Sequence, residues 1–256
     1  MHSNTARASQ TTEGRLWLVT GASSGIGRAI ALQLAAAGQQ VIAWGRNADR
    51  LAELQAQHAG IVGIQIVDLA DTERLAEQAL SCVQRWPQLS GLIHCAGIQH
   101  DVLMSDSGYN AAAIGEELRV NLAAPIELSR ALLPDLLAQP SARVVLVSSA
   151  LAFAPKRRAA TYNASKAGLH AFAQSLRAQL RDSGVWVLEL IPPLVDTPMT
   201  TGRGRRKLNP DAVAQALLSQ LLSRSRLPER IWVGPARALP WLLRLAPHSI
   251  QSFFLR

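Results

Sequence analysis

The fold is decided by the stretch Thr20-Gly21-Ala22-Ser23-Ser24-Gly25-Ile26-Gly27, which lies between a short apolar run and a segment of helical periodicity. Residues 15–20 predict a strand that ends at this turn, and residues 25–37 predict the helix that follows it. Gly21 permits the tight turn, Gly25 lets backbone N–H groups approach a pyrophosphate, and Gly27 lets the helix pack close to the sheet. The motif indicates a phosphate-binding turn, although a tight strand-to-helix connection alone has the same glycines.

Strands and helices alternate along the rest of the chain. Apolar runs predict further strands at 41–44, 61–67, 91–94, 143–147, 185–191 and 231–233. Two of the expected helices are long; one carries Leu118, Leu122, Leu132 and Leu136, and the other buries Leu169, Phe172, Leu176 and Leu180. Continuously apolar strands between helices are typical of a parallel sheet covered on both faces. We therefore expect an α/β fold, a single doubly wound (Rossmann) domain over 15–256 with a mostly parallel seven-stranded sheet.

The composition narrows the compartment in which we expect the protein and the classes of ligand that it binds. The chain has 256 residues, and its two cysteines, Cys82 and Cys95, make no disulfide framework, so we expect a reducing compartment, the cytoplasm. Residues 1–14 are polar and predict a disordered lead-in, and no apolar run has transmembrane length. The net charge of +8 favours anionic ligands, nucleic acid or an acidic membrane surface. No nucleic-acid module and no metal-ligand spacing of histidines occurs, so we expect neither nucleic acid nor a metal.

The end of the second predicted strand bears on the choice of dinucleotide. An NAD site usually places an acid there to bind the ribose hydroxyls. Here the stretch is Trp44-Gly45-Arg46-Asn47, and the guanidinium of Arg46 can pair with a 2′-phosphate. A solvated loop arginine is the alternative. The sequence favours NADP over NAD.

A second motif, Tyr162-Asn163-Ala164-Ser165-Lys166, predicts acid–base chemistry. Tyr162 and Lys166 are four residues apart and share one face of the expected helix. Lowering a phenol pKa by roughly 3 units needs about 4 kcal/mol. An ammonium at about 4 Å supplies roughly this amount at an effective dielectric constant near 20. The pair is credible as a tuned proton donor, although any surface Tyr-x-x-x-Lys has the same spacing.

In this context the chain resembles the short-chain dehydrogenase/reductase family from Arg15 to about Val233. The matching stretches are the glycine turn, Asp68-Leu69, Cys95-Ala96-Gly97, Asn121, Ser148-Ser149, the Tyr162–Lys166 motif, and Pro192-Pro193-Leu194-Val195-Asp196-Thr197. Two departures occur. His94-Cys95 replaces the usual Asn-Asn, which we expect to weaken a structural hydrogen bond, and Pro192-Pro193 replaces Pro-Gly, which stiffens the start of the substrate loop.

The resemblance implies four catalytic residues. Ser149 polarises the carbonyl, Tyr162 donates or accepts the proton, and Lys166 lowers the pKa of Tyr162 and holds the ribose hydroxyls. The main-chain carbonyl of Asn121 holds a water in a relay to Lys166. Pro125, four residues on, has no N–H, so this carbonyl lacks its normal helical hydrogen bond, unless Pro125 merely kinks a surface helix.

The resemblance also implies the residues that contact the cofactor. Asp68 and Leu69 contact the adenine, Ala96 and Gly97 form the floor, and Val195 and Thr197 hold the nicotinamide carboxamide. The complete expected set is Gly21, Ser23, Ser24, Gly25, Ile26, Gly27, Arg46, Asp68, Leu69, Cys95, Ala96, Gly97, Tyr162, Lys166, Pro192, Val195 and Thr197.

These features predict an NADP-dependent oxidoreductase that interconverts a ketone or aldehyde and an alcohol by hydride transfer, with Tyr162 as general acid/base. The alternative is a catalytically silent protein of the same fold that binds or senses a dinucleotide, because fold does not guarantee function.

Two segments concern the substrate and the partners. Residues 193–209 match the family's mobile lid and carry Arg203, Arg205, Arg206 and Lys207, while Lys156-Arg157-Arg158 lies between the expected serine and tyrosine. This charge attracts an anionic substrate or is solvated loop charge. The apolar tail, about 238–256, caps the pocket, packs between subunits or contacts a membrane peripherally. We favour subunit packing, since the family forms dimers and tetramers.

Overall fold

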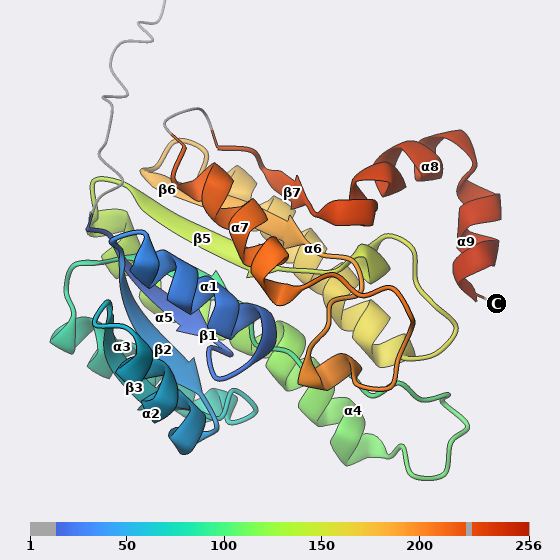
Figure 1. Ribbon diagram of the computed structural model, residues 1–256, viewed down its shortest axis with the longest axis horizontal. Coiled ribbons are helices and arrows are strands. Elements are labelled where there is room, and N and C mark those ends of the chain that lie inside the picture. Colours follow the sequence, from blue (N-terminus) through green and yellow to red (C-terminus); the bar gives the residue numbers. More distant parts are fainter. Residues whose placement is uncertain (1–13, 224–226, 256) are drawn as a thin grey trace, which may run out of the picture.

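The computed structural model describes residues 14–223 and 227–255 (Figure 1). The predicted lead-in, apart from Gly14, lies outside the described residues. Within the part described, seven strands form one parallel sheet in the order β3-β2-β1-β4-β5-β6-β7. The strands are β1 Leu16–Thr20, β2 Gln40–Gly45, β3 Ile61–Ile66, β4 Leu89–His94, β5 Ala142–Val147, β6 Val185–Ile191 and β7 Arg230–Trp232. The predicted seven-stranded doubly wound fold is confirmed.

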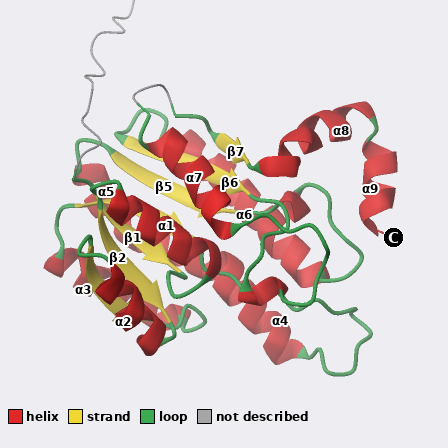
Figure 2. Ribbon diagram, viewed as in Figure 1, coloured by secondary structure: helices red, strands yellow, loops and turns green. Residues whose placement is uncertain are grey.

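Helices cover both faces of this sheet (Figure 2). Those described are α1 Gly25–Ala36, α2 Ala48–Gln57, α3 Leu75–Arg85, α4 Ala111–Leu118, α5 Ala124–Ala138, α6 Ala160–Gln179, α7 Pro210–Leu221, α8 Leu239–Leu245 and α9 Pro247–Leu255. Side chains of α1, α2 and α7 share one hydrophobic core with the sheet, and those of α3, α5 and α6 share the other.

The central strand shows why the strands are continuously apolar. Trp17 and Val19 belong to the core on the α1 side, whereas Leu16 and Leu18 belong to the core on the α5 side. Successive side chains of a strand point to opposite faces, and here both faces are buried. All five residues of β1 are therefore buried.

The helical run from 111 to 138 is interrupted by a π-helical turn, Arg119–Ala123. Pro125 has no N–H to offer to the carbonyls four and five residues before it, and Ala124 N donates to Arg119 O across the wider turn. The expected single helix is thus α4 and α5 joined by this turn; Leu118 before the turn is 37% exposed, whereas Leu132 and Leu136 after it are fully buried.

The chain ends in two short helices, α8 and α9, which pack against each other and stand apart from the two helix layers at the right of Figure 1. We call this segment, residues 239–255, the terminal hairpin. In the described part of the chain, no helix has the length and apolar character needed to cross a membrane.

Candidate active site

A cavity of about 920 Å³ lies at the carboxyl ends of the strands, where doubly wound folds bind ligands. Every residue of the predicted cofactor set lines it, from Gly21 after β1 to Thr197 after β6. Ser149, Tyr162 and Lys166 line the same cavity. Asn121 does not line it and is completely buried behind it.

The glycine turn makes room for a ligand by bringing β1, β4 and α1 close together. Gly21 and Gly25 have φ angles of +68° and +54°, in the left-handed region that favours glycine. A Cβ on Gly21 would lie 2.7 Å from Cα of Ala96, and one on Gly25 would lie 2.9 Å from Cγ2 of Thr197. Helix α1 has no side-chain cap at Ser24 and no acidic residue in its first turn. Its N-terminus therefore presents N–H groups and a positive dipole end to the cavity.

The turn is held to the neighbouring strand by Thr20, which the sequence placed at the end of the predicted strand but to which we assigned no role. Its Oγ1 accepts hydrogen bonds from the main-chain nitrogens of Cys95 and Ala96 at 3.1 and 3.2 Å. The side chain is buried, and it fixes the end of β1 against the end of β4. The sequence does hold a signal for this role, because Thr20 is a hydroxyl residue at the end of an otherwise apolar strand.

His94, which departs from the family's usual asparagine, has a buried partner of its own. Its Nε2 lies 2.9 Å from Oγ of Ser129 on α5. Burial lowers the pKa of His94 to about 3, and the charge of Lys166 contributes in the same direction. The imidazole is therefore neutral, and the hydrogen bond that we expected to be weakened at this strand end is replaced by one to α5.

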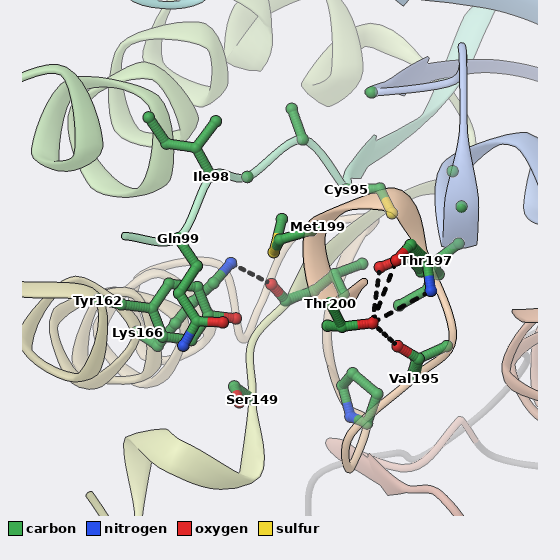
Figure 3. Close-up of a pocket in the computed structure, with 18 of the residues that line it drawn as sticks. Cys95, Ile98, Gln99, Ser149, Tyr162, Lys166, Val195, Thr197, Met199 and Thr200 are labelled. Atoms are coloured by element: carbon green, nitrogen blue, oxygen red, sulfur yellow. Dashed lines mark hydrogen bonds between the residues drawn. The ribbon is translucent and has the colours of Figure 1, made fainter. Parts of the chain in front are cut away.

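Three of the four predicted catalytic side chains meet where β5 and α6 face the cavity (Figure 3). Ser149 follows β5 and lines the same cavity as Tyr162. Burial raises the pKa of Tyr162 to about 12 and outweighs the influence of the Ser149 hydroxyl, which lowers it. The net direction is opposite to the lowering that the sequence predicts. The phenol therefore keeps its proton at neutral pH and can donate it.

Lys166 is buried and held by the sheet. Its Nζ donates a hydrogen bond of 2.9 Å to the carbonyl of Val147 and lies 5.8 Å from the centre of the Tyr162 ring. Burial lowers the pKa of Lys166 to about 8, so the amine carries a proton at pH 7 and loses it in mildly alkaline solution.

Asn121 lies in the π-helical turn and ties the loop after β4 to α6. Its Oδ1 accepts from Ile98 N at 2.9 Å, and its Nδ2 donates to Ile98 O at 2.8 Å and to Ser165 Oγ at 3.2 Å. A Cβ on Gly97 would lie 3.2 Å from this Oδ1 and 3.7 Å from Nζ of Lys166. The amide thus fixes the cavity floor beside the lysine.

The far end of the cavity is basic. Arg46 follows β2, and its Nη1 lies 3.3 Å from Oε1 of Glu116 in an exposed ion pair. Arg50 and Asn47 line the cavity beside it, and the last residue of β2 is Gly45 rather than an acid. An exposed pair of this kind is worth little and can exchange for another anion.

The basic clusters of the substrate side converge on one carboxylate. Asp101 Oδ1 accepts from Lys156 at 2.7 Å, and Asp101 Oδ2 lies 3.7 Å from Nε of Arg203. Arg158 donates to the main-chain oxygen of Asp101 at 2.9 Å from Nε. Asp101 thus offsets much of the charge on which the anionic-substrate prediction rests, whereas Arg205 and Arg206 are exposed.

The predicted lid begins with a rigid segment. Thr197 and Thr200 form a capping box, and Thr200 Oγ1 donates to Val195 O at 2.6 Å (Figure 3). Farther along the lid, Arg203 Nη1 donates to Gln99 Oε1 at 2.6 Å, which joins the lid to the loop after β4.

The terminal hairpin forms part of the cavity wall through Leu239, Leu242 and Phe254. Of the three roles weighed for the apolar tail, the structure therefore supports the one that encloses the pocket.

A parallel sheet of this order, with a glycine turn after β1 and a Tyr–Lys pair on the helix after β5, defines a Rossmann-fold oxidoreductase. The family model for short chain dehydrogenases matches residues 15–207, and the chain belongs to this family.

Known relatives agree with this assignment. An uncharacterized oxidoreductase of Bacillus subtilis, DltE, is 41% identical over 182 residues, which are 70% of this chain and 71% of that protein. A short chain dehydrogenase from Burkholderia cenocepacia, solved with NADP, has the same fold, with a TM-score of 0.84 at 23% identity over 96% of this chain and 100% of the other. A 3-oxoacyl (acyl-carrier-protein) reductase from Agrobacterium tumefaciens, solved with NADP, has a TM-score of 0.77 and is 26% identical in sequence. The match covers 86% of this chain and 93% of the other.

Proposed function

We propose that this oxidoreductase is an NADP-dependent enzyme that interconverts a ketone or aldehyde and the corresponding alcohol, with Tyr162 as general acid/base. The observation that carries the proposal is that Ser149, Tyr162 and Lys166 line the same cavity as the glycine turn. A proton donor and a phosphate-binding turn in one cavity are what hydride transfer to a carbonyl requires.

The cavity fits a nicotinamide dinucleotide. The glycine turn and the uncapped N-terminus of α1 suit a pyrophosphate, because a Cβ at Gly21 or Gly25 would close the turn. Asp68 and Leu69 would contact the adenine, and Val195 and Thr197 the nicotinamide amide. Arg46 and the absence of an acid at the end of β2 favour the 2′-phosphate of NADP. When bound, NADPH supplies the hydride.

The proton side of the reaction follows from the burial of Tyr162. Because its pKa is raised to about 12, the phenol holds the proton that a reduced carbonyl oxygen needs. As the carbonyl carbon gains the hydride, its oxygen gains the proton of Tyr162, and Ser149 stabilises the developing negative charge. Lys166, anchored to β5, would bind the ribose hydroxyls. The reductive direction follows from the NADP assignment.

The substrate side favours a carbonyl compound with apolar substituents. Met199, Leu194, Leu242 and Phe254 line the cavity, and the charges of Lys156 and Arg203 are offset by Asp101. We expect the enzyme to act in the cytoplasm and to form a homodimer or homotetramer.

The test is NADPH oxidation, followed by absorbance, over a panel of ketones and aldehydes that differ in charge and chain length. We expect turnover with apolar carbonyls and a preference for NADPH over NADH. Tight NADPH binding, seen by nicotinamide fluorescence, with no turnover across the panel would favour the silent dinucleotide-binding protein instead.

A further inference from the structure

The terminal hairpin exposes large apolar side chains that nothing in the described chain covers. Trp241 is 67% exposed, Leu245 is 80% exposed and Phe253 is 71% exposed. Trp241 and Leu245 are four residues apart on α8 and share one face. Phe253 lies on the adjoining helix α9. Several large apolar side chains exposed on one short segment mark an interaction surface.

The same segment carries one positive charge, Arg244, and no aspartate or glutamate. Arg230 and Arg237 precede it, and no acidic residue lies between 230 and 255. Arg244 is exposed and lies three residues from Trp241, on the face that the tryptophan shares. Tryptophan, leucine and phenylalanine beside arginine on short helices is the composition of segments that lie in a membrane interface.

We propose that the terminal hairpin docks on the surface of an anionic lipid bilayer, with Trp241, Leu245 and Phe253 in the interface and Arg244 against the headgroups. The positive charge of Arg244 favours an anionic bilayer over a second copy of the chain as the partner of this surface. Two hairpins placed face to face would bring their Arg244 side chains together, and the hairpin has no aspartate or glutamate to pair with them. An anionic headgroup complements both the charge and the apolar surface.

Docking would also place the cavity at the bilayer, because Leu239, Leu242 and Phe254 of the same hairpin line the cavity. This consequence rests on the proposed function: an apolar carbonyl compound would pass from the lipid phase to the cavity past the apolar side chains of the hairpin. The docking itself does not depend on turnover.

The experiment is co-sedimentation of the full chain with vesicles of phosphatidylcholine containing phosphatidylglycerol, beside vesicles of phosphatidylcholine alone. We expect binding to the anionic vesicles that weakens with salt. The double variant Trp241→Asp/Leu245→Asp should lower the partition coefficient at least 30-fold, and Arg244→Ala about fivefold. Tyr162→Phe should bind as the wild type does, so this readout is separate from activity.

Matched controls separate docking from general charge attraction. Leu80→Asp changes a leucine that is 57% exposed on α3, and Arg74→Ala changes an exposed arginine before α3; each should change binding less than twofold. Retained NADPH binding would show that each variant is folded. The proposal is overturned by wild-type binding no stronger than that of the double variant, or by equal losses in the controls. It is also overturned if the wild type binds no vesicles and forms a dimer without lipid that the double variant does not form.

Discussion

Lys166 on α6 donates a hydrogen bond of 2.9 Å from Nζ to the main-chain oxygen of Val147 at the end of β5. The bond fixes the amine under the cavity floor, in surroundings that disfavour its charge and lower its pKa to about 8. The protonation state of Lys166 therefore affects both its proposed catalytic role and the free energy of unfolding of the protein.

Replacing Lys166 by Met should reveal this coupling as a pH dependence of stability. Between pH 8 and 10.5 the unfolded chain binds a proton on this lysine that the folded protein lacks, so wild-type stability rises with pH. The free energy of unfolding of Lys166→Met minus that of the wild type should fall by about 1 kcal/mol from pH 7 to pH 9. Urea unfolding at the two pH values measures this, and an unchanged difference would contradict it.

Replacing Tyr162 by Phe should lower kcat at least 100-fold, because a positioned proton donor contributes about that much. NADPH binding should change less than threefold, since the phenol oxygen is lost and the ring stays. Stopped turnover with weakened cofactor binding would point to a collapsed site instead, and fluorescence titration distinguishes the two.

Replacing Arg46 by Asp should lower the ratio of kcat/KM for NADPH to that for NADH by about 10- to 100-fold, the value of a charged hydrogen bond. The matched variant is Glu116→Gln, which removes the partner of Arg46. It should keep the preference for NADPH and increase it by a few-fold at most, because an exposed pair is weak. A ratio that does not move in Arg46→Asp would refute the NADP assignment.

Replacing His94 by Asn, the usual residue of the family, should make the protein less sensitive to acid. With a folded pKa of about 3, His94 remains neutral while the unfolded chain binds a proton on it below pH 6.5, so stability falls as the pH drops. From pH 7 to pH 5 the wild type should lose about 2 kcal/mol more than His94→Asn. Thermal or urea unfolding at both pH values checks this; equal losses would count against it.

Replacing Asp101 by Ala should release the charge of Lys156 and Arg203 at the substrate side. We expect kcat/KM for an acidic carbonyl compound, relative to a neutral analogue, to rise by about 3- to 10-fold and to fall again with salt. Arg157→Ala, which changes an exposed arginine of the same loop, is the control. A rise of the same size for both substrates would instead indicate a loosened lid.

Much of this architecture could be predicted because its signals are local. Strand β1 and the glycine turn follow from an apolar run and three glycines, and Tyr162 and Lys166 share a face because of helical geometry. The predicted cofactor residues line one cavity because parallel strands place their carboxyl ends at one edge.

What could not be predicted depends on contacts distant in sequence. The burial that raises the pKa of Tyr162 comes from the assembled cavity, and spacing to Lys166 alone suggested the opposite direction. Asp101 pairs with Arg203, which is about a hundred residues away in the sequence. The acidic partner of the two basic clusters could therefore not be predicted from the sequence near either cluster. The π-helical turn at Arg119–Ala123 interrupts the helix that the leucine spacing predicted, because one extra residue in the turn departs from a strict 3.6-residue period.

The order of the strands has a consequence for synthesis on the ribosome. The segment up to Leu69 contains β1, β2 and β3 and the residues proposed for the phosphates and adenine, whereas Ser149 to Thr197 emerge only with β5, α6 and β6. A nascent chain can thus build the nucleotide half of the cavity while the half that holds the proton donor has not yet been translated. The two halves can join only after β5 has followed β4, because β4 lies between β1 and β5 in the sheet.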